Sequence, residues 1–335
     1  MRKILFICGS LNQTTMMHQI SKYFTNDDCW FTAYYGDGII NRAAQTGFLD
    51  FSILGGKFRK NTENYFKENN LKVDYRGANN NYDLVYTCAD LIIPKNIRDK
   101  KVILVQEGMT DPENFIYYLV RYLKLPRWLA STSMNGLSDL FDYFCVASDG
   151  YKEHFIRKGV KPEKLIVTGI PNFDNAKQFL NNNFPHKNFV LVCTSDARET
   201  FKYENRVKFI KECVTKAGGK QIIFKLHPNE NVERATKEIN TYAPGSLVYS
   251  SGNTNHMIAN CDSLITKYSS VVYIGIALGK EVHSYFNLSD LVKMTPIQNN
   301  GTSAERIARV GLRLLDSANS RIEIDDIKQL KSALS

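Results

Sequence analysis

Short apolar runs recur along the chain, and longer amphipathic stretches separate them. Most of these runs are nearly continuous Val, Ile, Leu and Phe, a pattern typical of parallel β-strands that are covered on both faces. The predicted strands are Ile4–Cys8, Trp30–Tyr35, Leu84–Cys88, Val102–Gln106, Tyr143–Ala147, Leu165–Thr168, Phe189–Thr194, Gln221–Leu226, Leu247–Tyr249, Ser263–Thr266 and Glu281–Phe286. Helices are predicted between them, for instance over Glu199–Ala217 and Asn231–Tyr242. This alternation predicts a doubly wound α/β fold that occurs twice in the chain.

A change of composition predicts where the two domains divide. The segment Gln178–Lys187 is rich in Asn and contains Pro185, as expected of a linker, and a new strand begins just after it. A chain of 335 residues also favours two domains over one. We therefore expect a first domain over residues 1–180 and a second over 188–335. The last helical stretch, Ile324–Leu334, either stays with the second domain or returns to the first.

Composition narrows the classes of partner. The sequence has 43 Lys and Arg against 34 Asp and Glu, a formal net charge of +9, and the basic residues are spread along the chain. A nucleic-acid-binding protein more often carries a dense basic stripe or a known module, so we expect an anionic small-molecule substrate and no nucleic acid. An anionic membrane surface stays open as a second partner.

The seven cysteines include no Cys-x-x-Cys and no paired spacing. We interpret them as reduced core residues, which predicts a cytoplasmic location and argues against a zinc site. The N-terminal run Met1–Gly9 is interpreted as the first strand rather than a signal peptide, and no segment is apolar for long enough to span a bilayer.

Three polar turns follow strands of the second domain. Thr194-Ser195 follows the first strand, His227-Pro228 the second and Ser269-Ser270 the fourth. In a sheet of order 3-2-1-4-5 these strands are neighbours, so the turns converge at one crevice at the carboxyl ends of the strands. Hydroxyls and N–H groups at the start of a helix suit a phosphate, and His227 can donate a hydrogen bond to a second phosphate oxygen.

Each of these residues also has a purely structural interpretation. His227 can be a turn histidine with Pro228 at the first position of a helix, and Ser269 a plain N-cap. Arg198 either pairs with a diphosphate or is a solvated first-turn residue. Lys267 either adds positive charge near the phosphate or points elsewhere.

The first domain offers a carboxylate at a strand end. Glu107 follows the buried strand Val102–Gln106 and can act as general base toward an acceptor hydroxyl, with Asp111 as an alternative base or Glu107 as a structural residue. Gly9-Ser10 ends the first strand, where Gly9 permits close approach of a ligand or loop. His18 lies in the following helix, on the surface or in the cleft.

The run 115–129 mixes aromatic, aliphatic and basic residues. Such a mixture suits docking on an anionic membrane or a lipid-linked acceptor, at the inner face of a membrane. The alternative is a core helix whose basic side chains reach out to solvent. On sequence alone the core helix is preferred.

Several of these segments resemble one enzyme group. Leu264–Val272 followed by Leu278-Gly279-Lys280 resembles the "TDYSS … LGKP" signature of CDP-glycerol glycerophosphotransferase-like proteins; Val167–Asp174 resembles their "TGxPRxD" and Phe224–Pro228 their "KxHP". Bacterial sialyltransferases and Kdo transferases share acidic-Gly, HP and Ser-Ser motifs, and non-hydrolysing UDP-GlcNAc 2-epimerases share the fold. The resemblance implies a GT-B fold, two Rossmann-like domains facing across a cleft. It also implies Glu107 as base and His227, Ser269 and Ser270 as ligands of the donor phosphate.

The chain departs from these signatures at several positions. Lys267 replaces the usual Asp of TDYSS, Asn172 the Arg of TGxPRxD, and Glu281 the Pro of LGKP. Gln106-Glu107 replaces the Trp-His of the glycerophosphotransferases. The last difference favours a sugar transferase with a carboxylate base.

The sequence therefore predicts an inverting, metal-independent glycosyltransferase with no separate cofactor. The expected donor is a nucleotide sugar, with CMP or CDP favoured and UDP open, and the expected acceptor is a glycan or lipid-linked molecule in cell-surface polysaccharide synthesis. No Asp-x-Asp at a strand end offers to hold a metal. The alternatives are a UDP-GlcNAc 2-epimerase-like enzyme, a CDP-glycerol-type polyol-phosphate transferase and a non-catalytic nucleotide-sugar binding protein.

Overall fold

A computed structural model describes residues 1–50, 52–200 and 202–316 of the chain. The chain forms two compact units. Unit 1 contains Met1–Val146, Lys152–Asn172 and the chain from Gly301 onward, and unit 2 contains Ala147–Tyr151 and Phe173–Asn300.

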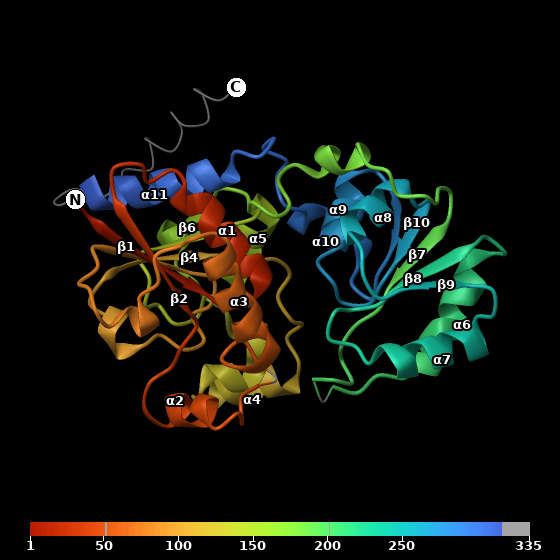
Figure 1. The fold of residues 1–335 in the computed structure, drawn as a ribbon, viewed down its shortest axis with the longest axis horizontal. Helices are drawn as coiled ribbons and strands as arrows, with labels where there is room; N and C mark the ends of the chain where they lie inside the picture. The colour runs from red at the N-terminus through yellow and green to blue at the C-terminus, as the bar shows by residue number, and fades with distance from the viewer. Residues whose placement is uncertain (51, 201, 317–335) are drawn as a thin grey trace. The chain divides into compact units, whose positions relative to one another are not determined.

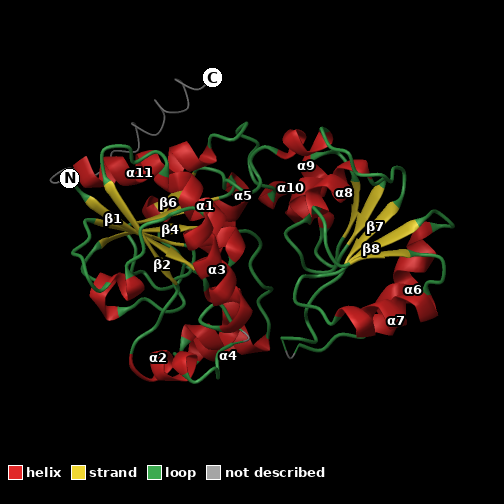
Figure 2. Cartoon of the chain, in the orientation of Figure 1, coloured by secondary structure: helices red, strands yellow, loops and turns green. Residues whose placement is uncertain are grey.

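Unit 1 is built on a parallel six-stranded sheet of order β2-β1-β3-β4-β5-β6 (Figures 1 and 2). Its strands are β1 (Lys3–Cys8), β2 (Asp28–Ala33), β3 (Leu84–Thr87), β4 (Lys101–Val105), β5 (Tyr143–Val146) and β6 (Leu165–Val167). The helices between and after them are α1 (Leu11–Ser21), α2 (Gly38–Gln45), α3 (Gly56–Glu68), α4 (Phe115–Tyr122), α5 (Asp149–Lys158), which belongs to this unit from Lys152 onward, and α11 (Ser303–Asp316). Strand order reverses after β2, as in a doubly wound fold.

Aromatic side chains stack across the first three strands of this sheet. Phe6 pairs with Phe31 on β2 and with Tyr86 on β3, and its ring stacks on theirs at centroid distances of 5.2 and 5.1 Å. All three side chains are buried. Cross-strand aromatic contacts of this kind stabilise the pairing and set its register.

Unit 2 is built on a parallel five-stranded sheet of order β11-β10-β7-β8-β9 (Figure 2). Its strands are β7 (Val190–Cys193), β8 (Ile222–Lys225), β9 (Leu247–Tyr249), β10 (Ser263–Ile265) and β11 (Glu281–His283). Its helices are α6 (Arg206–Ala217), α7 (Val232–Tyr242), α8 (Thr254–Asn260), α9 (Val272–Ala277) and α10 (Leu288–Met294). Counted within the unit, the strand order is 3-2-1-4-5, which confirms the predicted topology.

Every predicted strand is present, with ends that differ by a few residues. The predicted helix Glu199–Ala217 is shorter than expected, because α6 begins only at Arg206. Asn205 is its N-cap: the Asn205 side-chain oxygen accepts a hydrogen bond of 2.9 Å from the Lys208 N–H. Among the described residues, no helix is both long and apolar enough to cross a membrane.

All seven cysteines are free thiols, and only Cys29 is not fully buried. Burial is the main cause that raises the pKa of Cys145 and of Cys193 to about 12. Such thiols stay protonated at neutral pH and pack as small apolar groups.

The division of the chain differs from the expected one. Unit 2 already begins at Phe173, so the Asn-rich segment belongs to it, and the chain returns to unit 1 at Gly301. Helix α11 packs on the first sheet, where Tyr86 Oη donates a 3.1 Å hydrogen bond to the Ile307 carbonyl. The predicted helical stretch Ile324–Leu334 lies outside the described residues.

Gly311 on α11 is predicted not to tolerate a side chain. A Cβ there would lie 2.0 Å from Tyr86 Oη and 2.8 Å from Leu84 Cδ2. We expect Gly311→Val to lower the free energy of unfolding by about 2–3 kcal/mol, since overpacking forces α11 away from β3. Denaturation followed by circular dichroism measures this loss. Arg309→Val, at an exposed position of the same helix, is the control and is expected to cost less than about 1 kcal/mol. Equal losses in both variants would contradict the packing of α11 on this sheet.

Candidate functional site

The three polar turns of unit 2 leave its sheet from neighbouring strands. Strand β7 lies between β10 and β8, with Val192 opposite both Ile265 and Phe224. All these strands are parallel, so their carboxyl ends share one edge of the sheet, about 5 Å apart. The turns at 194–195, 227–228 and 266–270 therefore emerge side by side, as the strand order predicted.

His227 is oriented by its own turn. The His227 N–H donates to Thr194 Oγ1 and to Glu230 Oε2, both at 3.2 Å. Its ring Nδ1 accepts a hydrogen bond of 3.3 Å from the Asn229 N–H, and it lies 3.4 Å from Asp196 Oδ2. With Nδ1 as acceptor, the neutral ring carries its proton on Nε2, which is then a donor. The side chain is 38% exposed, so a ligand can reach it.

Pro228 starts a turn rather than a helix. The Glu230 N–H donates to the His227 carbonyl at 3.0 Å, and α7 begins only at Val232. The interpretation of Pro228 as the first residue of a helix is therefore wrong. Proline suits the second position of such a turn because its φ is fixed near the required value.

Four charged side chains lie behind these turns; we call them the Glu204 network: Lys267, Glu204, Arg206 and Glu230. Lys267 Nζ lies 2.8 Å from Glu204 Oε1, and Arg206 Nη2 lies 2.7 Å from an oxygen of Glu204 and of Glu230. The side chains of Glu204, Arg206 and Glu230 are at most 2% exposed. Two cations thus balance two anions, and all of these side chains except the partly exposed Lys267 are closed to water.

This network joins the polar turns. Glu230 Oε2 accepts a hydrogen bond from Thr194 Oγ1 at the end of β7 and from the His227 N–H at the end of β8. Arg206 Nη2 donates to the Ser195 carbonyl at 2.8 Å, and Lys267 brings in the end of β10. The positions of the three turns are therefore coupled through one set of ion pairs.

The two carboxyls of the network differ in their proton affinity. Burial acts to raise the pKa of Glu204, but the hydrogen bond from Lys267 and the charges of Arg206 and Lys267 outweigh it, so the pKa is lowered. For Glu230 burial dominates over the Arg206 charge, and its pKa is raised. Glu204 is therefore the firmly ionised member, and it holds both cations.

Lys267 does not point toward the expected phosphate. Besides its ion pair with Glu204, its ammonium lies over the rings of Phe209 at 4.8 Å and Tyr285 at 5.6 Å. The cation–π contacts and the ion pair together hold the ammonium in this inward position. The idea that Lys267 adds positive charge at the ligand is therefore wrong. Where the signature has Asp this chain has Lys267, and the Glu204 carboxylate balances its positive charge.

The Ser-Ser turn has a different geometry from the one expected. Helix α9 begins at Val272, and its N-cap residue Val271 is already helical. Ser269 Oγ accepts only a long, 3.5 Å bond from the Val271 N–H, so Ser269 is not an N-cap. Both serines are half-buried, in a turn in which the carbonyls of Ser269 and Ser270 accept from the next turn of backbone.

The remaining predicted donor ligands have protein partners. Arg198 forms a two-pronged salt bridge with Glu238 on α7, both bonds being 2.8 Å, which contradicts the prediction that it pairs with a diphosphate. Thr194 is buried and bonded to Glu230, and Ser195 Oγ donates to Glu204 Oε1 at 3.3 Å. These side chains position the turns.

Unit 1 holds Glu107 in a defined orientation. Ser10 Oγ donates to Glu107 Oε1 at 2.7 Å, and Gln13 Nε2 donates to Glu107 Oε2 at 2.6 Å. Ser10 is the N-cap of α1 and accepts from the Gln13 N–H at 3.2 Å. The carboxylate is half-buried at the ends of β4 and β1, with one bond to each oxygen.

Gly9 allows this arrangement. Its N–H donates to Gln13 Oε1 at 3.0 Å, and a Cβ at Gly9 would lie only 2.3 Å from that oxygen. The absence of a side chain thus admits the Gln13 amide, rather than a ligand, beside the end of β1.

The other two candidate residues of unit 1, His18 and Asp111, have contacts of their own. His18 packs with Phe31 and Tyr65, and its Nδ1 lies 3.0 Å from Tyr65 Oη, so it is a packing residue between α1, α3 and β2. Burial lowers its pKa, with a further contribution from Lys22. Asp111 lies further along the loop after β4, where its N–H donates to Thr132 Oγ1 at 2.9 Å.

Sequence inspection missed Gln13, Glu204, Arg206 and Glu230. Ser10-x-x-Gln13 matches the capping-box spacing, which signals a side chain folded back at a helix start. For Glu204, Arg206 and Glu230 the sequence contains only weaker indications of a role at the site. Glu230 lies three residues after His227. Glu204 precedes α6 and Arg206 is its first residue, within a stretch that the sequence pattern assigns wholly to the helix.

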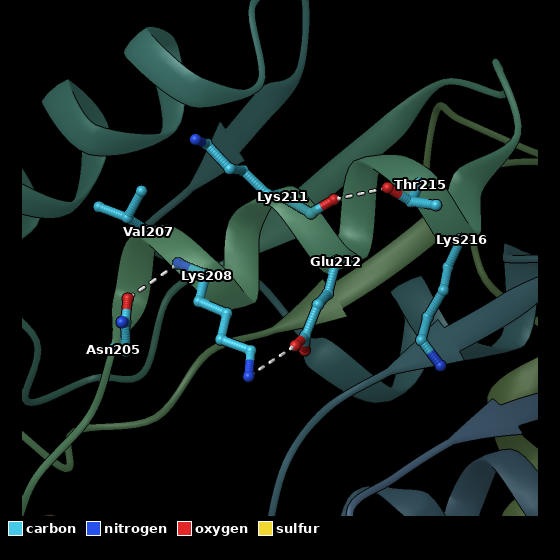
Figure 3. Close-up of a pocket in the computed structure, with 7 residues that line it drawn as sticks. All are labelled: Asn205, Val207, Lys208, Lys211, Glu212, Thr215 and Lys216. Atoms are coloured by element: carbon cyan, nitrogen blue, oxygen red, sulfur yellow. Dashed lines mark hydrogen bonds and ion pairs between the residues drawn. The ribbon is translucent and has the colours of Figure 1, made fainter.

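A separate hollow of about 530 Å³ runs along α6 (Figure 3). Lysines and Glu212 line it, and Lys208 lies 3.9 Å from Glu212 one helical turn away. No predicted site residue lines this hollow, and its charges are those of an ordinary solvated helix face.

Known structures match nearly the whole chain. A UDP co-structure of S. aureus MnaA aligns with a TM-score of 0.57 at 12% identity, covering 96% of this chain and 100% of that one. UDP-GlcNAc 2-epimerase from Neisseria meningitidis, bound to UDP-GlcNAc, aligns with a TM-score of 0.54 at 12% identity, covering 93% and 100%. A variant of the wall teichoic acid polymerase TagF aligns with a TM-score of 0.50 at 12% identity, covering 94% and 89%.

The fold is GT-B. No protein-family model matches the sequence, and no curated protein sequence matches it. These neighbours include a polymerase and a UDP-GlcNAc 2-epimerase, and at 12% identity their likeness establishes this fold alone. Within the GT-B fold, the reaction has to be inferred from this chain's own strand-end residues.

We predict that Lys267→Met destabilises the protein by about 3 kcal/mol, because it leaves the buried Glu204 carboxylate with one cation fewer. Urea denaturation measures the loss. The double variant Lys267→Met/Glu204→Gln is expected to recover part of it, since no unpaired charge remains. Lys220→Met, which breaks the exposed 2.8 Å pair with Asp262, is the matched control and is expected to cost less than about 1 kcal/mol. A loss in Lys267→Met no larger than in this control would contradict the network's role.

Proposed function

We propose that this protein is an inverting glycosyltransferase that moves a sugar from a nucleotide-activated donor to a glycan or lipid-linked acceptor in cell-surface polysaccharide synthesis. The observation that carries the proposal is the edge of the second sheet. His227 and the Ser269-Ser270 turn emerge there from strands on either side of β7, and the Glu204 network fixes both from behind. A cytidine nucleotide is preferred from the sequence resemblance, with uridine as the alternative.

In this proposal the donor's phosphate lies between His227 and the two serines. His227 Nε2–H donates to a phosphate oxygen, and the hydroxyls of Ser269 and Ser270 donate to others. As the bond to the sugar breaks, negative charge grows on the leaving phosphate, and donors already in place stabilise that charge without reorganising. The proposed mechanism uses these protein donors and no metal.

Glu107 is the proposed general base, acting on the acceptor hydroxyl. Each of its oxygens accepts one hydrogen bond, from Ser10 or Gln13, and a carboxylate oxygen has a second lone pair available. The two donors hold the carboxylate in one orientation, which is what a proton acceptor for a bound hydroxyl requires. Attack by that hydroxyl on the face opposite the leaving phosphate gives inversion.

An epimerase acting on a UDP-sugar is the second candidate. The epimerase from Neisseria meningitidis aligns with a higher TM-score than the teichoic acid polymerase variant does, and UDP-GlcNAc is bound in it. A transferase and an epimerase differ in their need for an acceptor, so one assay separates them.

That assay incubates the protein with CMP-, CDP- and UDP-sugars and with CDP-glycerol, with and without candidate glycan and lipid acceptors. Acceptor-dependent release of nucleotide from a sugar donor supports the transferase. Epimerisation at C2 without acceptor supports the epimerase, and transfer from CDP-glycerol supports a polyol-phosphate transferase. Binding without any turnover supports a nucleotide-sugar binding protein.

We predict that His227→Ala weakens nucleotide binding by about tenfold to a hundredfold, the scale of one lost hydrogen bond to a charged group. Isothermal titration with the nucleotide chosen by the screen measures the change. His256→Ala on α8, a half-buried histidine away from these turns, is the control and is expected to bind normally. Unchanged affinity in His227→Ala would remove this residue from the site.

We predict that Glu107→Gln leaves nucleotide affinity unchanged and lowers turnover by about a hundredfold or more, the scale expected for loss of a general base. The substitution keeps the shape of the side chain, and steady-state kinetics with the identified acceptor measure its effect. Glu113→Gln, an exposed position six residues on, is the control. An equal loss of nucleotide affinity in Glu107→Gln would refute its assignment as base.

A further inference from the structure

Helix α4 and the segment after it turn an apolar surface outward. Tyr117 and Val120 are buried and pack with Ala130 and Met134. Most of the other large apolar side chains in 115–129 are exposed; we call them the apolar face: Phe115, Ile116, Tyr118, Leu119, Tyr122, Leu123, Leu125, Trp128 and Leu129. The prediction of an ordinary core helix is therefore wrong. Only one narrow stripe of α4 reaches the core.

The exposure is large for such residues. Phe115 is 78% exposed, Tyr122 77% and Trp128 46%. Near α4, at the same end of unit 1, α2 and its following turn add Ile39 and Phe48, also strongly exposed (Figure 1). Proteins in solution rarely leave so many large apolar side chains of one short segment exposed, so this segment points to a binding partner.

The charge around the apolar face identifies the kind of partner. Residues 114–129 contain Arg121, Lys124 and Arg127 and no Asp or Glu. Lys95 and Arg98 lie beside them at a shared pocket. Among the described residues, none of these five basic side chains forms an ion pair with a carboxylate. Arg121 instead donates to Tyr117 Oη at 2.6 Å.

The shared pocket is also lined by both apolar and basic side chains. It has a volume of about 360 Å³, and its lining joins the start of α2 at Ile40 to Leu125 and Trp128. Arg98 and Arg127 also line it, together with one carboxylate, Asp37, which accepts a 2.7 Å hydrogen bond from the Lys95 N–H. An apolar hollow with cations at its wall fits an amphiphile that has an anionic head and an apolar body.

We propose that the apolar face binds the surface of a bilayer that contains anionic phospholipid. Phenylalanine and leucine side chains enter the boundary between headgroups and acyl chains, tyrosine and tryptophan rings lie at the headgroup level, and the basic side chains meet lipid phosphates. The inference rests on this surface alone and does not depend on the proposed transferase activity.

The first test is cosedimentation of the intact protein with vesicles. Vesicles of phosphatidylcholine are compared with vesicles of phosphatidylcholine and phosphatidylglycerol at about 7:3. We expect binding at least about tenfold tighter to the anionic vesicles at low salt, and a marked weakening at about 1 M salt, where charges are screened over a few ångströms. No donor, nucleotide or acceptor is present, so failure here leaves the transferase proposal untouched, and the reverse also holds.

Trp128 reports on the contact directly. The chain has two tryptophans, and the other, Trp30, donates to Asp28 within unit 1, so a Trp30→Phe background leaves Trp128 as the single emitter. We expect its emission to shift to shorter wavelength when anionic vesicles are added, because the indole leaves water. Unchanged emission in a protein that sediments with vesicles would show that another surface makes the contact.

Variants separate the apolar and the ionic contributions. Phe115→Ser/Tyr122→Ser is expected to weaken vesicle binding about tenfold or more, and Arg121→Gln/Lys124→Gln to abolish the preference for anionic lipid. Leu180→Ser, an exposed leucine of unit 2, and Lys216→Gln/Lys237→Gln are the matched controls and are expected to bind like the parent protein. Circular dichroism verifies that every variant is folded.

Two results would overturn the proposal. One is the absence of sedimentation with either kind of vesicle. The other is self-association, seen as a dimer in analytical ultracentrifugation that Phe115→Ser/Tyr122→Ser converts to monomer without any vesicle binding. That result would assign the apolar face to a second copy of the chain.

Discussion

The ion pairs of Glu204 are the interaction on which the candidate donor site depends. A buried carboxylate is costly to remove from water, and the two cations beside it, Lys267 and Arg206, offset that cost. Through Arg206 and Glu230 the same charges hold the turns that follow β7 and β8, and through Lys267 the turn that follows β10. Since these turns carry His227 and the serines, the orientation of the proposed phosphate donors is set by groups that touch no ligand.

Unit 1 uses a local device for a similar purpose. Glu107 comes from the end of β4, and both of its bonds come from the first turn of α1, where Ser10 caps the helix and Gln13 folds back beside Gly9. A helix cap thus also orients a carboxylate from another strand. In both units, then, parallel strands bring polar side chains to one edge, and nearby hydrogen bonds or ion pairs select their orientation.

The apolar face shows how little composition says about burial. The stretch 115–129 has the makeup of a core helix, yet α4 has only eight residues and buries only Tyr117 and Val120. Such a short helix contacts the core along one narrow stripe, so the rest of its side chains face outward whatever their type. Part of the excess basic charge is concentrated here, because Lys95, Arg98 and Arg127 line one pocket together with the exposed Trp128.

The sequence by itself determined the strands, the order of the second sheet, and the strand ends at which His227, Ser269-Ser270 and Glu107 lie. Continuous apolar runs and parallel topology are local or general properties, so they can be inferred from one chain. Only the tertiary structure decided which polar groups pair. Arg198 binds Glu238, Lys267 turns inward to Glu204, and α11 returns to unit 1. Such pairings join residues far apart in the chain, and their energies depend on burial, which only the folded arrangement of the strands and helices creates.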